Sequence, residues 1–347
     1  MTENKFQNLR KEEKIEVFNA VAEKLGIRPV AVEKDWWVCR SLEIIFQMEA
    51  SNHLVFKGGT SLSKAWKLID RFSEDVDLAI NKEFFAGYDG DISRHQINRL
   101  RKEAGAYTMG AFYSQLKEEF NRRGYTGLQF KVENSDNGDQ DPTVLEIYYP
   151  TVIGEDSEYI LPRVQIEIGC RSLREPFSMQ KFGSFIDEIY AGRDFASPLI
   201  QVPTVNPERT FLEKVFLLHE EFQRPNEKIR VNRLSRHLYD LVMLSRTNFA
   251  DKALADSNLY ETIVRHRYKF TRVGGVDYNL HHPTTINPIP PSNMIDAWRA
   301  DYAVMREQMI YKTDSPTFDE LMKEIKLLQD RINSVPWSLS LSFSKER

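Results

Sequence analysis

The chain has 347 residues, of which 41% are hydrophobic, 12% aromatic and 28% charged. These proportions are typical of folded soluble domains, and they exclude a chain that is wholly disordered, collagen-like or coiled coil. The formal net charge of −4 excludes a uniformly basic coat for nucleic acid. A local basic patch is still compatible with it, because phosphates are bound by a few residues on one face.

The length favours two domains, since domains average roughly 150 residues. No apolar run approaches the roughly 18 residues needed to cross a bilayer, and residues 1–13 contain no apolar signal-peptide core. We therefore predict a cytoplasmic protein without a membrane partner. Cys39 and Cys170 are too few for a disulfide framework and lack the Cys or His neighbours of a zinc site, so both are predicted to be buried thiols.

Two helices are predicted in the first fifty residues. Apolar residues recur at helical spacing from Ile15 to Leu25, and Gly26 can end that helix. Pro29 occupies a favoured first-turn position and predicts the start of the second helix.

A phosphate-binding turn is predicted after the next strand. The apolar run 53–56 predicts this strand, and the segment from Thr60 to Ile69 predicts a helix. Between them, Gly58 and Gly59 let the backbone approach a phosphate. Thr60 adds a hydroxyl where the helix N-terminus directs its amide hydrogens at the anion.

Two acidic residues follow on a second predicted strand, residues 75–80. Asp75 and Asp77 project from one face, while Val76 and Leu78 project from the other, toward the core. Two carboxylates in one small volume repel each other unless a cation lies between them. Mg²⁺ suits this position because it leaves places for nucleotide phosphate oxygens. An isolated Asp-x-Asp is more often an exposed strand edge, but the glycine turn before it favours a metal and nucleotide site.

The middle of the chain predicts helices followed by an extension of the sheet. Residues 93–123 predict one long helix or two. Alternating runs near 128–132, 144–149 and 163–168 predict strands, and the polar stretch 134–139 is a strong turn signal. We expect these strands to extend the sheet in an antiparallel manner.

A domain boundary is predicted near residue 200, in the proline-containing stretch 197–207. Residues 1–200 are expected to form an α+β core, a mixed sheet with flanking helices together with the N-terminal helices. Residues 201–347 are expected to form a helical domain, in which the prolines between 271 and 291 predict a long ordered loop.

Four blocks of the sequence resemble a known family. In chain order they are Gly-Gly-Thr-Ser-Leu-Ser-Lys at 58–64, Arg-Phe-Ser-Glu-Asp-Val-Asp at 71–77, Glu-Arg-Thr-Phe-Leu-Glu-Lys at 208–214 and Ser-Arg-His-Leu-Tyr-Asp-Leu at 235–241. Weaker similarity occurs at 33–37 and 301–305. The chain resembles the AbiEii/AbiGii-type nucleotidyltransferases, which include the MenT toxins, within the polymerase-beta-like nucleotidyltransferase superfamily. This resemblance spans about residues 30–330 in order and implies a polymerase-beta-like core and NTP-dependent nucleotidyl transfer.

The resemblance also implies roles for individual residues. The residues it assigns to catalysis are Asp75, Asp77, Ser73, Lys214 and Asp240. The residues it assigns to nucleotide and phosphate binding are Gly58, Gly59, Thr60, Lys64 and Arg236. Two Mg²⁺ ions would be held by the aspartates. Lys214 would neutralise developing charge, and Asp240 would orient a basic partner or contact the nucleotide.

Helical spacing alone is also compatible with non-catalytic roles for the residues between 214 and 240. Lys214 lies on the border of an apolar stripe, where a lysine commonly extends its ammonium to solvent. Arg236 and Asp240 would form an ordinary ion pair between residues i and i+4. His237 would either position the substrate or be a neutral core histidine. The resemblance favours active-site roles for Lys214 and Asp240.

A third carboxylate that faces the metal is expected from the superfamily, and Glu167 is our choice. In the run 164–168 the apolar residues share one face, and Glu167 projects from the other on a strand that could adjoin the Asp-x-Asp strand. Glu146 offers a similar but poorer case. A solvent-facing glutamate is an equally good interpretation of Glu167.

Two basic clusters could hold RNA phosphates and stack an unpaired base. The first consists of Lys228, Arg230, Arg233 and Arg236, and the second of Arg265, Arg267, Tyr268, Lys269, Phe270 and Arg272. Runs of charge are also common on solvated helix faces, so the clusters leave both interpretations open.

These observations predict a Mg²⁺-dependent enzyme that transfers a nucleoside monophosphate from an NTP to an acceptor hydroxyl. The resemblance implies a toxin of an abortive-infection or toxin-antitoxin system, with a separate antitoxin partner and, for MenT-like members, the tRNA 3′ end as acceptor. Two alternatives stay open. One is nucleotidylation of a protein side chain, and the other is a catalytically idle module that binds nucleotide.

Overall fold

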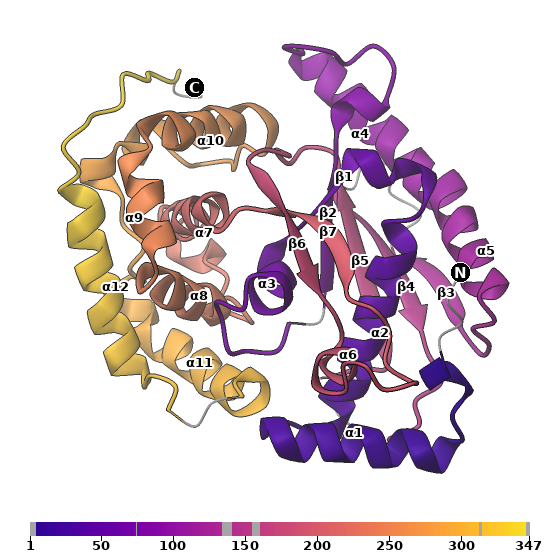
Figure 1. The fold of residues 1–347 in the computed structure, drawn as a ribbon. Helices are drawn as coiled ribbons and strands as arrows, with labels where there is room; N and C mark the ends of the chain where they lie inside the picture. Colours follow the sequence, from indigo (N-terminus) through magenta and orange to yellow (C-terminus); the bar gives the residue numbers. More distant parts are fainter. Residues whose placement is uncertain (1–4, 74, 134–140, 155–159, 312–313, 345–347) are drawn as a thin grey trace. The chain divides into compact units, whose positions relative to one another are not determined.

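A seven-stranded sheet is the framework of the first of two units into which the chain divides (Figure 1). The computed structural model describes residues 5–73, 75–133, 141–154, 160–311 and 314–344. Unit 1 comprises Met1–Lys67 and Phe72–Val205, and unit 2 comprises Leu68–Arg71 and Asn206–Arg347. The chain therefore leaves unit 1 for a short segment, Leu68–Arg71, before it returns. The turn predicted at 134–139 lies outside the described residues.

The sheet has the strand order β3-β4-β5-β2-β1-β7-β6. Its strands are β1 (Leu54–Lys57), β2 (Asp75–Ile80), β3 (Gln129–Glu133), β4 (Thr143–Tyr148), β5 (Arg163–Gly169), β6 (Phe177–Phe182) and β7 (Ile200–Val205). Strand β2 pairs antiparallel with β1 and parallel with β5. Strands β3, β4 and β5 pair antiparallel, as the sequence predicts. The α+β class with a mixed sheet is confirmed.

Strands β6 and β7 are not predicted from the sequence. β7 occupies the stretch interpreted there as an interdomain connection, and the boundary predicted at residue 200 coincides with its first residue. Pro203 lies inside β7, where its missing N–H argues against an interior strand. The strand nevertheless pairs antiparallel with β6 over six residue pairs, whereas its parallel pairing with β1 is confined to Phe56 and Thr204.

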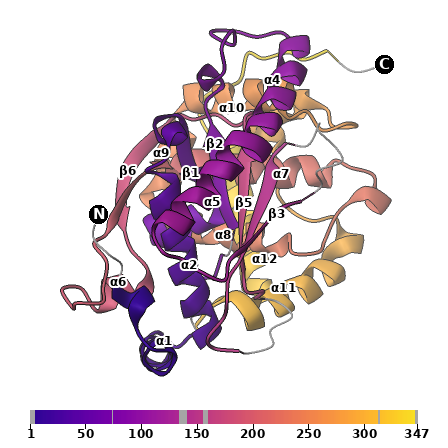
Figure 2. The same cartoon turned by 90° about the vertical axis from the view of Figure 1, so that its right-hand side faces the viewer.

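Helices α2, α4 and α5 lie over one face of the sheet (Figure 2). The helical elements of unit 1 are η1 (Lys5–Asn8), α1 (Lys11–Leu25), α2 (Pro29–Ile45), η2 (Glu49–His53), α3 (Gly58–Thr60), η3 (Ser61–Ala65), η4 (Lys82–Phe84), α4 (Arg94–Tyr107), η5 (Thr108–Phe112), α5 (Tyr113–Arg122) and α6 (Phe185–Ile189). Gly26 ends α1 in a left-handed conformation, and Pro29 begins α2, as predicted. The helix predicted to reach Ile69 is wrong, because it ends at Ala65 and Ile69 belongs to unit 2.

Helix α2 is buried along nearly its whole length, which is expected of a helix that packs on several sides. It contacts β2, β5, α1, α5 and α6. Burial of its charged residues is compensated by partners. The Arg40 guanidinium donates to the Asp187 carboxylate at 2.7 Å, and Lys64 Nζ lies 2.7 Å from the Asp35 carboxylate. Cys39 on this helix and Cys170 are buried free thiols, as predicted.

Unit 2 is helical apart from short connections. Its elements are α7 (Pro207–Phe222), η6 (Asn226–Lys228), α8 (Ser235–Ser245), α9 (Asn248–Ala255), α10 (Ser257–Phe270), η7 (Tyr278–His281), η8 (Pro283–Thr285), η9 (Ser292–Met294), α11 (Ile295–Met309) and α12 (Phe318–Asn333). Helix α8 packs against α7, α9, α11 and α12. The loop predicted from 271 to 291 contains the short turns η7 and η8. Within the described ranges, none of the helices has both the length and the apolar character that a membrane span requires.

A buried histidine makes the stability of unit 2 dependent on pH. His219 on α7 is 3% exposed, and burial together with the neighbouring His281 lowers its pKa to about 3. An unfolded histidine has a pKa of about 6.5. Between pH 6.5 and pH 3 the histidine is therefore protonated in the unfolded chain, whereas His219 stays unprotonated in the folded protein. This contribution to stability is complete above pH 6.5 and is lost as the pH falls toward 3.

We expect His219→Asn to reduce the loss of stability on acidification. Between pH 6.5 and pH 3 the histidine contributes a slope of up to about 1.4 kcal/mol per pH unit, which the variant lacks. Urea unfolding at pH 7 and pH 5 measures the difference. His95→Asn, at an exposed position on α4, is the control and should keep the wild-type slope. An unchanged slope in His219→Asn would contradict the assignment.

Candidate active site

The acidic residues of unit 1 come together because β2 and β5 are parallel neighbours. Asp77 is the register partner of Glu167, and Asp75 is that of Gln165. Val76 and Leu78 are fully buried, so alternation along the strand directs the three carboxylates to the opposite face. The predicted adjacency of the two strands is confirmed, whereas metal binding by these residues stays a prediction.

The carboxylates of Asp77 and Asp75 interact electrostatically with that of Glu167. Its burial, and then the negative charges of Asp77 and Asp75, raise its pKa to about 7. Gln165 Nε2 donates a hydrogen bond to Glu167 Oε1 at 2.9 Å, and Lys57 opposes the rise in pKa with its positive charge. The three carboxylates therefore repel one another, and a bound cation would relieve this repulsion.

The chemistry of these donors suits Mg²⁺, which takes carboxylate oxygens. In the described part of the chain, however, no three His, Cys, Asp or Glu side chains form a group placed to hold a metal ion. Metal binding by Asp75, Asp77 and Glu167 therefore stays a prediction. Glu146, the alternative third acid, is engaged by the Arg163 guanidinium and by the Tyr148 hydroxyl.

The glycine turn lies against the same cluster. Gly58 follows β1 directly and has a φ of 76°, a left-handed conformation that favours glycine. A Cβ added at Gly58 would collide with the Asp77 carboxylate. The backbone of the turn therefore approaches the acidic cluster as closely as it does only because residue 58 has no side chain.

Thr60 and Ser73 connect the turn to the acidic strand. The Thr60 hydroxyl donates a hydrogen bond to the Asp75 carbonyl oxygen at 2.5 Å and shares a second with the Ser73 hydroxyl at 3.0 Å. Thr60 is fully buried, so its side chain fixes the turn to the strand and is not exposed to a ligand in this structure. The helix that begins here consists of the short segments α3 and η3, so its dipole is small.

Lys64 lies on the inner side of this turn. It is 6% exposed, its Nζ is paired with the Asp35 carboxylate, and its ammonium lies 3.9 Å from the centre of the Phe185 ring. The structure therefore places Lys64 as a support of the turn, attached to α2, and not beside the acidic cluster. Any contact with phosphate would require this ion pair to break.

The predicted residues of unit 2 form a compact buried cluster of charges. Asp240 on α8 is fully buried and accepts two hydrogen bonds from Arg71, Nε to Oδ1 at 2.7 Å and Nη2 to Oδ2 at 2.8 Å. Lys214 Nζ lies 2.8 Å from Asp240 Oδ2 and donates to His237 Nδ1 at 3.3 Å. The ion pair expected between Arg236 and Asp240 is replaced by these two contacts. Asp240 therefore contacts two basic side chains, Arg71 and Lys214, and its role in the reaction stays a prediction.

The protonation states of this cluster follow from its contacts. Burial would raise the pKa of Asp240, but Arg71 and Lys214 outweigh it and hold the pKa well below the ordinary value. Burial lowers the pKa of Lys214. The negative charge of Asp240 opposes this decrease, whereas the positive charge of Arg71 adds to it. Burial and the positive charges of Lys214 and Arg236 lower the pKa of His237 well below its ordinary value. His237 is therefore neutral and accepts the hydrogen bond from Lys214.

Most members of the two basic clusters already have partners. Glu221 accepts hydrogen bonds from Arg230, and Glu220 accepts them from Arg267. Arg265 is paired with Glu261, and the Arg272 guanidinium lies 4.6 Å from the centre of the Tyr268 ring. Tyr268 also packs against Phe343. The second cluster is therefore mainly a structural network, while Arg236 makes no ion pair among the described residues.

Two further residues of this region had no role predicted from the sequence. Lys57 ends β1 as the register partner of Asp77 and opposes the negative charge at Glu167. Arg71 anchors Asp240. The signal for Arg71 was its position in the block 71–77, but its partner lies 169 residues away in sequence and could not be identified from spacing.

Comparison with protein families identifies the chain. A family model described as "Nucleotidyl transferase AbiEii toxin, Type IV TA system" matches residues 40–324. The match covers most of the chain, and the chain belongs to this family of nucleotidyltransferase toxins. The predicted resemblance and enzyme class are confirmed. Family membership implies that an NTP is the substrate and that an antitoxin is the partner.

Comparisons with individual proteins add little. No curated protein matches the chain in sequence. Among solved structures, MenT4, a nucleotidyltransferase toxin from Mycobacterium tuberculosis H37Rv, is similar with 18% identity and a TM-score of 0.42. This similarity covers 92% of the present chain and 98% of MenT4. At that level we transfer no residue role from it.

We expect Gly58→Ala to destabilise unit 1 and displace Asp77. The new methyl group adds a collision with the Asp77 carboxylate to the cost of a left-handed alanine, which is about 1–2 kcal/mol. Gly87→Ala is the matched control, because Gly87 has a φ of 87° but nothing within 4 Å of an added Cβ. Chemical unfolding of both variants should show the larger loss for Gly58→Ala, and equal losses would refute the close approach.

We expect Arg71→Leu to destabilise the protein by about 3–5 kcal/mol, because it leaves part of the Asp240 charge buried without a partner. Arg265→Leu is the comparison, since it removes an exposed ion pair with Glu261 and should cost no more than about 1 kcal/mol. Denaturant unfolding measures both. A small cost for Arg71→Leu would show that the pair contributes little to the fold.

Proposed function

We propose that this enzyme transfers a nucleoside monophosphate from an NTP to the 3′ end of tRNA in a Mg²⁺-dependent reaction. The observation that carries the proposal is the position of Asp75 and Asp77 beside the Gly58 turn in a chain of the AbiEii family. The acceptor hydroxyl oxygen forms a bond to the α-phosphorus and its proton passes to solvent, while the bond from the α-phosphorus to the α,β-bridging oxygen breaks and pyrophosphate leaves.

Residues of unit 1 supply the binding of the triphosphate. Asp75 and Asp77 would hold two Mg²⁺ ions, with Glu167 close enough to their charge to adjust to a bound cation. When bound, these ions would activate the acceptor oxygen and stabilise the leaving group. Gly58 and Gly59 would present the turn to the phosphates, and Ser73 would keep the turn fixed against the acidic strand through Thr60.

Residues of unit 2 supply positive charge in a fixed orientation. We propose that Lys214 neutralises the negative charge that develops on the phosphates. Its position is set by Asp240, whose charge is itself held by Arg71. His237 is neutral and would keep the ammonium directed without competing for the phosphate. Arg236 would bind a phosphate of the nucleotide or acceptor.

The tRNA acceptor rests on the resemblance to MenT-like proteins. It would place the enzyme in the cytoplasm as the toxin of an abortive-infection system, neutralised by a separate antitoxin. In the first basic cluster, Lys228 and Arg236 would contact the RNA, whereas Arg230 is engaged by Glu221. A protein acceptor would use the same chemistry and is an outcome that the following experiment distinguishes.

We expect Asp75→Asn to lower nucleotidyl transfer at least about 100-fold, because it weakens the binding of the charge that stabilises the transition state. The assay supplies each α-labelled NTP with Mg²⁺, total tRNA and cell protein, and follows the label in both acceptors. Asp89→Asn, an exposed acid in the same unit, is the control and should keep full activity.

Each outcome of this assay has one interpretation. Label in tRNA that disappears with Asp75→Asn supports the proposal and reveals the nucleotide preference. Label in protein alone would refute tRNA as the acceptor. Equal labelling by the wild type and Asp75→Asn would refute the assigned site, and absence of label with every NTP would favour an idle nucleotide-binding module.

A further inference from the structure

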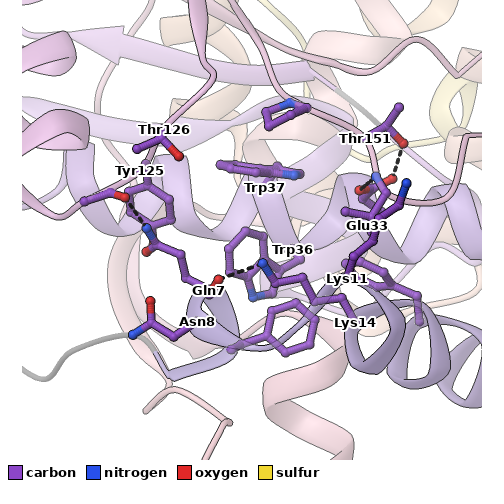
Figure 3. A pocket seen from close by; sticks show the side chains of 15 residues that line it. Gln7, Asn8, Lys11, Lys14, Glu33, Trp36, Trp37, Tyr125, Thr126 and Thr151 are labelled. Atoms are coloured by element: carbon purple, nitrogen blue, oxygen red, sulfur yellow. Dashed lines mark hydrogen bonds between the residues drawn. The ribbon is translucent and has the colours of Figure 1, made fainter.

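A cavity in unit 1 has a volume of about 450 Å³, and polar groups that line it bond to protein atoms around it (Figure 3). The Gln7 amide donates a hydrogen bond to the Gly124 carbonyl oxygen at 2.6 Å, and Lys14 Nζ donates one to the Gln7 carbonyl oxygen at 2.6 Å. The Glu33 carboxylate accepts one from the Thr151 hydroxyl at 2.6 Å. These groups are satisfied within the protein, so they do not indicate a ligand. The segment that follows α12 in unit 2 differs, because part of its backbone has no partner.

This segment alternates strictly between apolar residues and serine. Residues 337–343, which we call the tail segment, have the sequence Trp-Ser-Leu-Ser-Leu-Ser-Phe. Each apolar residue of the tail segment is half-buried, and each serine is exposed. A period of two is that of an extended chain with one face against the protein. The tail segment is nevertheless not part of any sheet in the described structure.

Aromatic side chains fix both ends of the tail segment to unit 2. Trp337 Nε1 donates a hydrogen bond to the Leu254 carbonyl oxygen at 2.9 Å, and the Trp337 ring meets that of Tyr260 edge-on with a centroid distance of 5.0 Å. The rings of Phe343 and Tyr268 lie 4.5 Å apart. Figure 1 shows the chain after α12, in yellow, running past α9 to α10. The tail segment is thus held in place, and a partner would not first have to order it.

One backbone edge of the tail segment is closed by Asn279. In an extended chain, the N–H and C=O of one residue point to the same side, and those of the next residue point to the opposite side. The Phe343 N–H donates to Asn279 Oδ1 at 2.8 Å, and Asn279 Nδ2 donates to the Phe343 carbonyl oxygen at 3.0 Å. The edge formed by the odd-numbered residues therefore faces unit 2.

The opposite edge, formed by the even-numbered residues, is open. In the part of the chain that the structure describes, no backbone N–H or C=O group from residue 338 to residue 342 makes a hydrogen bond. The edge ends at Ser344, whose carbonyl oxygen accepts a hydrogen bond from Arg272 Nη2 at 3.5 Å. An open edge is a template for another strand, and proteins commonly protect such edges with charged side chains. The tail segment contains no charged residue.

The tail segment is self-complementary in the antiparallel direction. With a twofold axis at Ser340, each serine of one copy lies opposite a serine of the other. Leu339 lies opposite Leu341, and Trp337 lies opposite Phe343. Aromatic pairs and pairs of hydroxyl residues are favourable across antiparallel strands, and like charges are unfavourable. Self-pairing therefore gains the favourable pairs and brings no like charges together.

We propose that the tail segment pairs antiparallel with the tail segment of a second copy of this chain. The dimer has its twofold axis at Ser340, and the backbone groups of Ser338, Ser340 and Ser342 bond across it. The apolar side chains of each copy stay against their own unit 2. A ladder of this length is smaller than a standard interface, so a weak and reversible dimer is expected. This surface belongs to unit 2 alone and does not rest on the proposed function.

Sedimentation velocity of the full chain, from micromolar to near-millimolar concentration, tests the proposal. We expect the wild type to move toward twice the mass of one chain as the concentration rises. Ser340→Pro should weaken the dimer at least about tenfold, because proline removes the ladder N–H from both copies. Ser340→Ala keeps this N–H and should dimerise as the wild type does. Thermal unfolding at low concentration checks that the Ser340→Pro monomer is intact.

Cysteine cross-linking tests the register independently. Ser340→Cys places two thiols opposite each other, since hydrogen-bonded antiparallel partners have Cα atoms about 5.5 Å apart, within reach of a disulfide. Ser338→Cys is the matched control, because its two copies would be about 13 Å apart along the strands. Under mild oxidation Ser340→Cys should cross-link and Ser338→Cys should not, whereas a mixture of Ser338→Cys and Ser342→Cys should. The native thiols Cys39 and Cys170 are buried and do not compete.

Three results would overturn the proposal. A wild type that stays monomeric would exclude self-pairing and leave the open edge to a different protein. A dimer that Ser340→Pro does not weaken would place the interface elsewhere on the chain. Cross-linking of Ser338→Cys as fast as that of Ser340→Cys would contradict the twofold axis at Ser340. The labelling assay with Asp75→Asn tests catalysis separately from all of these.

Discussion

The interaction on which the second unit depends is the pair formed by Arg71 and Asp240. A carboxylate that is fully buried can keep its charge only if positive groups compensate for lost hydration, and here Arg71 and Lys214 do so together. Asp240 is buried because its helix, α8, packs against four other helices. Arg71 belongs to the segment Leu68–Arg71, which is part of the second unit although it lies between two stretches of the first unit in the sequence. Only three residues then separate Arg71 from Asp75 in the chain. The same motif therefore contributes a structural anchor to one unit and a proposed metal ligand to the other.

Much of the sheet could be predicted from alternation along the strands. The apolar residues around Asp75 and around Glu167 define one buried face on each strand, and this was sufficient to place both acids on the opposite face. Strand β7 could not be found in this way, because Pro203 is a signal for a loop and its place in the sheet depends on pairing with a strand that is equally weak in pattern. Local sequence predicts which face a residue occupies better than it predicts which strands are neighbours.

The candidate site shows the same limit for single side chains. Lys64 follows the glycine turn as a phosphate-binding lysine would, yet it points to Asp35, a residue separated from it by most of α2 and the first strand. Thr60 was expected to offer its hydroxyl to a ligand, and the hydroxyl is bonded to the Asp75 carbonyl instead. In both cases the residue type agrees with phosphate binding, and tertiary contacts that spacing cannot reveal determine where the polar group points. Asp240 differs, because the sequence predicts a basic partner for it and the structure pairs it with Lys214 and Arg71.

The excursion of Leu68–Arg71 also bears on how the protein could be divided. If the gene were divided near residue 200, the N-terminal fragment would contain Arg71 without its partner Asp240. The C-terminal fragment would contain the Asp240 carboxylate without Arg71. The bridge between Arg71 and Ile310 and the hydrogen bond from the Tyr311 N–H to the Asp70 carbonyl oxygen would be lost in the same cut. The second unit is thus discontinuous in sequence, and neither gene fusion nor recombination at the apparent boundary would transfer it as a self-contained module.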